Sequence, residues 1–270
     1  MDPKRYQILL TNDDGIRSPG LWAAANALSS LGYVTVAAPR EQATSMGRAM
    51  PISSDGKITQ VELQIGEQQW PAYAVGGSPA QAALHGILEL MPRKPDLLVS
   101  GINYGENVGT GLTISGTVMA AMEGAAHGIP ALAVSAQQLN STWYDYADLD
   151  FTAAAYFTRL FAGQLLEHAM PADVDVLKLD VPFGATPQTP WRITRQARHV
   201  YYRPYILREG ALDEKSGISV RLDMQPGEAA PDSDAHTLMY DHLVSVTPLS
   251  LDLTSRIDLS QFESDLRSRV

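Results

Sequence analysis

The sequence predicts an α/β fold, in which helices cover both faces of a mostly parallel, doubly wound β-sheet. Short apolar runs of strand length alternate with longer segments whose apolar residues recur at helical spacing, and this alternation is typical of such folds. In the first part of the chain, runs at 6–11 and 33–38 flank a helical segment at 20–31. Two strands joined through a helix are expected to run parallel, with a right-handed crossover. At 270 residues the chain is long enough to bury a large core.

The same alternation continues as far as residue 182. Residues 52–75 alternate in short runs around Asp55-Gly56 and Ile65-Gly66, which indicates either antiparallel strands or an excursion from the main sheet. Beyond them the sequence predicts a helix at 79–90, a strand at 96–100, a helix at 115–127, a strand at 131–135, a helix at 151–168 and a strand at 174–179. Each predicted strand after a helix therefore adds one strand to the parallel sheet.

After residue 182 the regular alternation is lost. A segment rich in Arg and Tyr at 191–205 and a polar loop at 227–234 precede a predicted strand at 243–248 and a predicted helix at 259–269. We interpret residues 183–270 as an extension made of a β-hairpin, a returning strand and a terminal helix. Such extensions often serve contacts between subunits, although a lid over a site would fit the sequence equally well.

The composition disfavours several classes of protein. The formal net charge is -10, from 30 acidic and 20 basic residues, so binding of nucleic-acid polymers is not expected, because it requires clustered Lys and Arg. The absence of cysteine excludes disulfides and thiolate metal sites, and it fits a reducing compartment. No apolar stretch approaches the ~18 residues of a membrane helix, and the run at 8–10 is too short for a signal peptide. We therefore expect a cytoplasmic protein without a membrane partner.

Two adjacent carboxylates, Asp13 and Asp14, follow the first predicted strand and precede Gly15. In a parallel α/β sheet, ligands bind beyond the carboxyl ends of the strands. A glycine at a strand end lets the chain turn, so both carboxylates can converge there. A divalent cation would relieve their mutual repulsion. The same residues would also suit a surface turn in which Asp13 caps the next helix.

Further oxygen atoms follow two other predicted strands. A hydroxyl from Thr44 or Ser45 and the amide oxygen of Asn103 lie in loops that would meet the aspartates at the same edge of the sheet. Carboxylate, amide and hydroxyl oxygens are the ligands that Mg²⁺ and Mn²⁺ prefer. Each of these residues alone is an ordinary loop residue, so their joint placement is what predicts a metal site. Such a donor set leaves positions open for water and substrate.

A glycine-rich segment at 105–116 leads into the predicted helix at 115–127. A helix N-terminus approached in this way offers backbone N–H groups to an anion. We predict that Ser115, Gly116 and Thr117 form a phosphate cradle, with Asn107 nearby. Ser115 would also suit the N-cap of the helix, and the two roles are compatible.

Other signatures are missing from the sequence. Neither G-x-x-x-x-G-K-[ST] nor a G-x-G-x-x-G after the first strand occurs, which disfavours a P-loop and an NAD-dependent oxidoreductase. No G-x-S-x-G is present to form a hydrolase elbow. The six histidines show no H-E-x-x-H spacing, so zinc is not indicated. His236 lies in an acidic loop and is a candidate general acid.

Three segments resemble the hallmark motifs of the SurE family of survival-associated 5′(3′)-nucleotidases. They are ILLTNDDG at 8–15, SGIN at 100–103 and SGTVMAAMEG at 115–124. The resemblance runs in order from 7 to about 135 and resumes with SVTPL at 245–249. The middle of the C-terminal half matches less clearly.

The resemblance implies a Rossmann-like domain, one divalent metal ion per subunit, and homodimers or homotetramers built with C-terminal extensions. The metal ligands of the family fall on Asp13, Asp14 and Asn103, and its phosphate contacts fall on Asn107, Ser115, Gly116 and Thr117. The family usually has serine as its hydroxyl ligand, and an ungapped count places Thr44 at that position, with Ser45 beside it. We therefore divide the chain into a metal- and phosphate-binding domain at 1–182 and an oligomerisation extension at 183–270.

Together these observations predict a metal-dependent phosphatase that hydrolyses nucleoside monophosphates, with Asp13 and Asp14 as its catalytic pair. The resemblance also implies activity toward 3′-monophosphates and polyphosphate. Water is the expected nucleophile, because direct attack by a carboxylate such as Asp13 usually goes with D-x-D rather than adjacent aspartates. The alternative function is a non-catalytic nucleotide-binding or sensing module on the same sheet.

Overall fold

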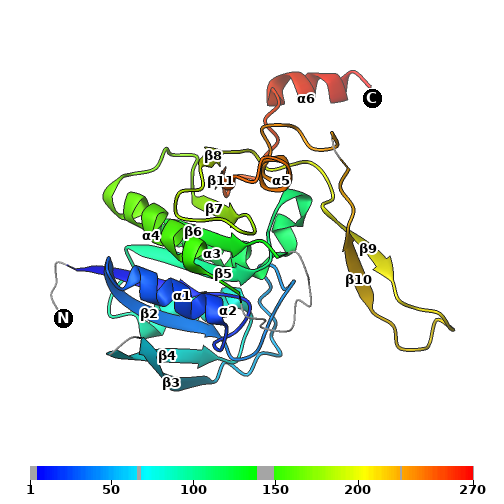
Figure 1. Ribbon diagram of the computed structural model, residues 1–270. Helices are drawn as coiled ribbons and strands as arrows, with labels where there is room; N and C mark the ends of the chain where they lie inside the picture. Colours follow the sequence, from blue (N-terminus) through cyan, green and yellow to red (C-terminus); the bar gives the residue numbers. More distant parts are fainter. Residues whose placement is uncertain (1–4, 66–67, 139–148, 226, 270) are drawn as a thin grey trace.

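The computed structural model describes residues 5–65, 68–138, 149–225 and 227–269. Its central sheet has nine strands: β1 (Tyr6–Thr11), β2 (Gly32–Pro39), β3 (Ile58–Ile65), β4 (Gln68–Val75), β5 (Leu97–Tyr104), β6 (Ala131–Ala136), β7 (Val176–Val181), β8 (Trp191–Ile193) and β11 (Val244–Leu249). Their order is β3-β4-β2-β1-β5-β6-β7-β11-β8 (Figure 1). The predicted α/β fold with a mostly parallel sheet is confirmed.

Helices cover both faces of this sheet. One face carries α1 (Pro19–Leu28) and α4 (Thr152–Glu167), and the other carries α2 (Pro79–His85), the π-helical turn η1 (Gly86–Leu90) and α3 (Gly116–Ala126). Ile8 and Leu10 of β1 pack on the first side and Leu9 on the second. Because the central strands are buried on both faces, their sequences are continuous apolar runs.

The two edges of the sheet contain antiparallel pairs. Of the two alternatives for residues 52–75, the antiparallel strands are present as β3 and β4, and β4 pairs in parallel with β2, so the pair extends the main sheet. At the other edge, β11 runs antiparallel to β7 and parallel to β8. The boundary at residue 182 therefore falls between strands of one sheet, and the division into two domains stays a prediction.

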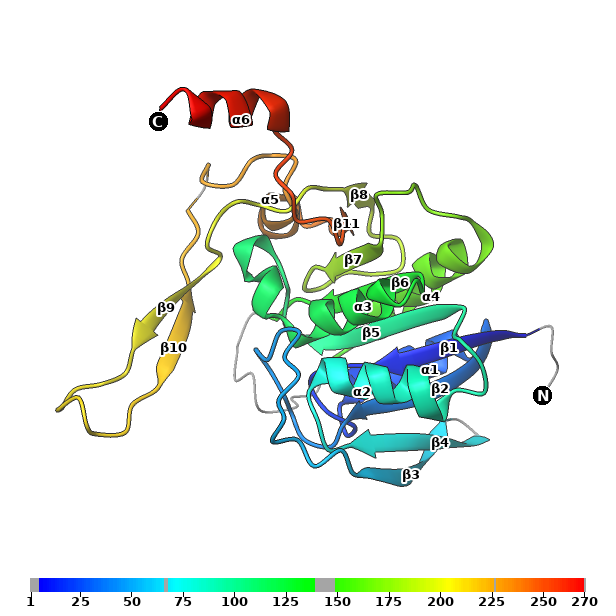
Figure 2. The same cartoon turned by 180° about the vertical axis from the view of Figure 1, so that it is seen from behind.

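The remaining elements lie outside the sheet. The hairpin of β9 (Tyr202–Ile206) and β10 (Ile218–Leu222) is antiparallel and projects from the body in both views (Figures 1 and 2). The other elements are the 3₁₀-helix η2 (Gly109–Ile114) and the helices α5 (Asp234–Met239) and α6 (Leu259–Arg267). The predicted hairpin and terminal helix are thus present. Among the described residues, none of the helices combines the length and apolar composition needed to cross a membrane.

Several predicted boundaries were wrong by two to four residues. The helix expected at 20–31 ends at Leu28, and the strand expected at 96–100 continues to Tyr104. The helix expected at 79–90 spans that range, but it is α-helical only as far as His85 and continues as a π-helical turn, which apolar spacing alone does not predict. The strand expected at 174–179 is β7, two residues later, because its pairing with β6 starts at Val176.

Gly20→Ala is expected to destabilise the fold, because α1 approaches β5 at this glycine. A Cβ at Gly20 would lie 2.1 Å from the carbonyl oxygen of Ile102, a backbone atom of β5. We expect a loss of about 1–3 kcal/mol or more in the free energy of unfolding, measured by urea denaturation.

Gly163→Ala in α4 is the matched control, since an added Cβ there meets no described atom within 4 Å. It should stabilise by about 0.5–1 kcal/mol, because alanine favours the helix over glycine. Equal effects of the two substitutions would contradict the packing argument.

Candidate active site

The loops that follow β1, β2 and β5 meet at one edge of the sheet. β1 pairs in parallel with both β2 and β5, so the carboxyl ends of the three strands are adjacent. The Ala43 N–H donates to the Asp13 carbonyl at 2.7 Å, which joins the loop after β2 to the loop after β1. A cavity of about 290 Å³ is lined by seven of the predicted residues: Asp13, Asp14, Thr44, Ser45, Asn103, Asn107 and Ser115.

Asn12 closes the turn that carries the two aspartates. Its Nδ2 donates to the Gly15 carbonyl at 3.0 Å, and its Oδ1 accepts from the Gly15 N–H at 3.2 Å. Gly15 has a φ of +91°, in the left-handed region that favours glycine. The sequence predicted this turn from Gly15 and missed the role of Asn12.

Both aspartates are almost fully buried, with exposed fractions of 3% for Asp13 and 2% for Asp14. Asp13 accepts a hydrogen bond from the Thr117 hydroxyl. Asp14 Oδ2 accepts from the Tyr104 N–H at 3.0 Å, and Asp14 Oδ1 accepts from Gln42 Nε2 at 3.4 Å.

Burial makes this carboxylate pair costly to ionise. It raises the pKa of Asp13 to about 6, although hydrogen bonds from Thr117 act in the opposite direction. Burial, and then repulsion from Asp13, raises the pKa of Asp14 to about 8. A bound cation would offset both causes, because it favours the charged form of each carboxylate.

Neutral oxygen atoms line the same cavity as the pair. Thr44 Oγ1 is buried and, within the part of the chain that the structure describes, has no hydrogen-bond partner. An unpaired buried hydroxyl is unfavourable, so this atom fits a ligand from outside the chain. Ser45 is exposed and has a φ of +63°, which makes it the weaker candidate. Asn103 lies within β5, beyond a shift of register after Ser100, and not in a loop as predicted. Its Nδ2 donates to the Gly105 carbonyl at 2.7 Å, which leaves its Oδ1 available as a ligand to a cation.

These oxygen ligands suit a hard cation. Across residues 5–65, 68–138, 149–225 and 227–269, no group of three or more His, Cys, Asp or Glu side chains is placed to hold a metal ion. The set at this edge is two carboxylates with neutral oxygens, which suits Mg²⁺ or Mn²⁺ better than zinc. Metal binding itself stays a prediction.

The predicted phosphate cradle forms the start of α3. Ser115 is the N-cap, with its Oγ accepting from the Val118 N–H at 3.1 Å, and it also lines the cavity. Gly116 packs on Asp13 so closely that an added Cβ would lie 2.6 Å from the Asp13 Cβ. Thr117 is fully buried and its hydroxyl contacts Asp13. The structure therefore gives Thr117 an orienting role that the sequence did not predict, and the phosphate contacts stay predictions.

The far wall of the cavity comes from residues that the sequence did not single out. They are Glu106, Ile114, Val200, Tyr201, Tyr202, Pro204 and Val220, together with neighbouring backbone. The hydroxyls of Tyr201 and Tyr202 donate to Glu106 Oε1 at 2.8 and 2.6 Å. The cluster of tyrosines at 201–205 was the available signal, but its position depends on how the hairpin folds back.

His236 is not among the described residues that line the cavity. It lies in α5, where its ring centroid is 5.2 Å from that of Tyr240. The structure therefore does not support His236 as the general acid.

Comparison with known proteins identifies the family to which this fold and these motifs belong. Residues 8–203 match the family model described as survival protein SurE. The chain belongs to the SurE family. Its relatives include the 5′-nucleotidase SurE of Methanosarcina acetivorans, 38% identical over 98% of each chain, and that of Thermococcus gammatolerans, 40% identical over 96% of each chain. The SurE crystal structure from Aquifex aeolicus superposes with a TM-score of 0.72 at 29% identity, and covers 96% of this chain and 99% of its own.

Without divalent metal, this SurE protein is expected to lose stability as the pH rises from about 4 to 8. The aspartates have an ordinary pKa of 3.8 when unfolded and of about 6 and 8 when folded. In this window the folded state binds more protons than the unfolded state, so the free energy of unfolding falls with rising pH. Asp14→Asn should reduce the fall between pH 6 and 8 by at least about 1 kcal/mol, measured by urea denaturation with a chelator present.

Asp252→Asn is the control for this measurement. Asp252 is exposed, and a hydrogen bond from Thr254 lowers its pKa, so it is already ionised throughout this pH range. In the control, the free energy of unfolding should fall with rising pH as steeply as in wild type. If it also falls as steeply in Asp14→Asn, the burial argument is wrong.

Proposed function

We propose that this SurE protein hydrolyses nucleoside 5′-monophosphates to nucleoside and phosphate, in a reaction that depends on one Mg²⁺ or Mn²⁺ ion per subunit. The observation that carries the proposal is the buried pair Asp13 and Asp14, which shares one cavity with Thr44 and Asn103. The chain is an enzyme of the same class as its relatives, which are named 5′-nucleotidases and match it over nearly its whole length.

The site residues divide into two groups. Asp13, Asp14, Thr44 and Asn103 would hold the metal ion through oxygen atoms. When bound, the ion would supply Lewis-acid activation of the phosphate and of the attacking water. Asn107 and the first turn of α3 would bind phosphate oxygens, because the first N–H groups of a helix lack partners within the helix.

The rest of the cavity suits a nucleoside. Apolar side chains of Ile114, Val200 and Val220 line it together with the rings of Tyr201 and Tyr202. We place the phosphate at the aspartate end and the nucleoside along this apolar wall. The same chemistry extends to nucleoside 3′-monophosphates and to the terminal phosphate of polyphosphate, and one substrate panel tests all three.

Water is the proposed nucleophile. Asp13 is almost fully buried, its Oδ1 accepts a hydrogen bond from the Thr117 hydroxyl, and Gly116 packs against its Cβ. These contacts hold the carboxylate in one orientation and leave it little room to move toward phosphorus. A phosphoenzyme trapped on Asp13 would refute this assignment.

We also propose a cytoplasmic homodimer or homotetramer. Large apolar side chains are exposed on the hairpin and on α6: Tyr205, Ile206, Leu207, Leu212, Ile218, Leu222, Leu259, Phe262 and Leu266. Exposed apolar surface on projecting segments is typical of contacts between subunits. The formal charge of -10 gives no support for a nucleic-acid polymer as partner.

Hydrolysis of AMP and GMP is expected to stop when divalent ions are chelated and to return when Mn²⁺ or Mg²⁺ is added, as followed by phosphate release. Asp14→Asn should stay inactive after metal is restored, with an unchanged circular dichroism spectrum. A non-catalytic binding module would bind AMP and release no phosphate from AMP or p-nitrophenyl phosphate. Full activity in chelator would contradict metal dependence.

Two neighbouring substitutions decide which hydroxyl is the ligand. Thr44→Val keeps the shape of the side chain and removes its buried oxygen, so it should weaken Mn²⁺ binding at least about tenfold, measured by titration calorimetry. Ser45→Ala is the matched control and should leave the affinity nearly unchanged. The opposite pattern would assign Ser45 as the ligand.

A further inference from the structure

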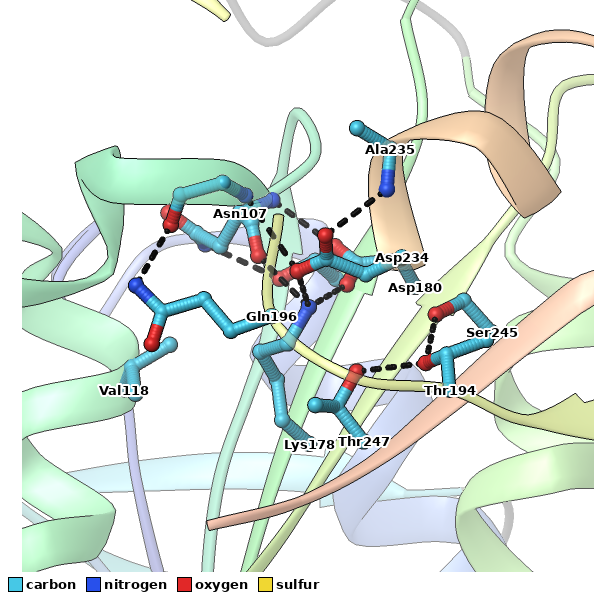
Figure 3. Close-up of polar contacts among 12 residues, drawn as sticks. Asn107, Val118, Lys178, Asp180, Thr194, Gln196, Asp234, Ala235, Ser245 and Thr247 are labelled. Carbon is cyan, nitrogen blue, oxygen red and sulfur yellow. Dashed lines mark hydrogen bonds and ion pairs between the residues drawn. The ribbon is translucent and has the colours of Figure 1, made fainter. Parts of the chain in front are cut away.

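A buried ion cluster, which the proposed reaction does not use, adjoins the loop that carries Asn107. It joins Lys178 and Asp180 of β7 to Asp234 of α5, and all three residues are 0% exposed (Figure 3). Lys178 Nζ donates to the Asp180 carboxylate and to Asp234 Oδ2, the latter at 3.2 Å. Buried ion pairs add little net stability compared with apolar packing, so stability alone is a weak explanation for this cluster.

The cluster binds both backbone polar groups of Asn107. Asp180 Oδ1 accepts from the Asn107 N–H at 2.7 Å, and Lys178 Nζ donates to the Asn107 carbonyl at 2.8 Å. The Asn107 side chain is held as well, with its Nδ2 donating to Ser135 Oγ of β6 at 2.9 Å. Side chains of two neighbouring strands therefore fix the position of a residue proposed to bind phosphate.

Asp234 connects the same loop to the segment that precedes Tyr201 and Tyr202. Its Oδ2 accepts from the Gly109 N–H at 3.2 Å, and its Oδ1 accepts from the Ala197 N–H at 2.9 Å. Ala197 lies just before the cavity-lining residues 200–202. One carboxylate thus joins the loop that carries Asn107 to the segment that leads to Tyr201 and Tyr202.

We propose that Lys178, Asp180 and Asp234 are positioning residues that set the place of Asn107 against the substrate phosphate. This inference rests on the proposed function, because it takes Asn107 as a phosphate contact. A small displacement of a positioned group lowers the efficiency of an enzyme strongly, even when the substituted residue does not touch the substrate. The cluster therefore governs phosphate affinity through the backbone of the loop at 107–109.

Asp180→Asn tests the proposal with a side chain of the same shape. The new amide must turn its nitrogen toward either the Asn107 N–H or Lys178 Nζ. Because both of these groups are hydrogen-bond donors, one of the two hydrogen bonds is lost. We expect the KM for AMP and the inhibition constant of inorganic phosphate each to rise about tenfold or more, with a smaller change in kcat.

The double variant Lys178→Met/Asp180→Asn keeps the test decisive if the single variant does not fold. It removes one positive and one negative charge, so the net charge of the cluster is unchanged. The bond from Lys178 to the Asn107 carbonyl is lost. The same rise in KM and in the phosphate inhibition constant is expected.

Thr194→Val is the matched control. Its hydroxyl is buried nearby and bonds to Ser245 and Thr247, both at 2.8 Å, instead of to the loop at 107–109 (Figure 3). This variant should lower the melting temperature and leave both constants unchanged.

The proposal is overturned if the folded cluster variants keep both constants within about twofold of wild type, or if Thr194→Val raises them equally. If wild-type protein releases no phosphate from any nucleotide, the proposed function fails instead. Calorimetric titration of wild type and variants with inorganic phosphate then still decides whether the cluster sets phosphate affinity.

Discussion

The rest of the structure depends on one constraint, the close approach of three loops at the ends of strands. This approach buries two neighbouring carboxylates. Burial opposes this arrangement, since it raises the pKa of both Asp13 and Asp14, and repulsion from Asp13 raises the pKa of Asp14 further. The parallel pairing of β1 with β2 and β5 brings the loops together regardless of that cost. The site is therefore preorganised at the expense of stability, which is a common trade-off in enzymes.

Small residues and buried polar contacts give the surrounding frame its rigidity. Gly116 lets the start of α3 pack directly on Asp13, and Gly20 lets α1 pack directly on β5. On the other side, the cluster around Lys178 holds the loop of Asn107 from behind. The two groups of site residues are thus supported by different parts of the fold, the first by close backbone packing and the second by ion pairs.

The sequence predicted those site residues whose positions follow from the order of neighbouring strands and the loops after them. Asp13 and Thr44 follow strands whose parallel order was predictable, and Asn103 lies near the carboxyl end of a third such strand. In a parallel sheet the carboxyl ends of neighbouring strands meet. Lys178 and Asp234 escaped prediction because they are separated by 56 positions in the chain. A buried lysine within an apolar strand has no local sequence signal, since only the folded chain supplies its partners. The pairing of β8 and β11 with the main sheet escaped prediction for the same reason.

The hairpin connects substrate binding with the surface proposed for subunit contacts. Tyr202, Pro204 and Val220 of this hairpin line the cavity. In the same two strands Ile206 pairs with Ile218, and both are exposed. Since residues of one short strand cannot move independently, a subunit packed on the exposed isoleucines would also restrict the cavity wall. Assembly would then act on the end of the cavity proposed to bind the nucleoside, whereas the end proposed to bind phosphate is formed by loops of the central sheet.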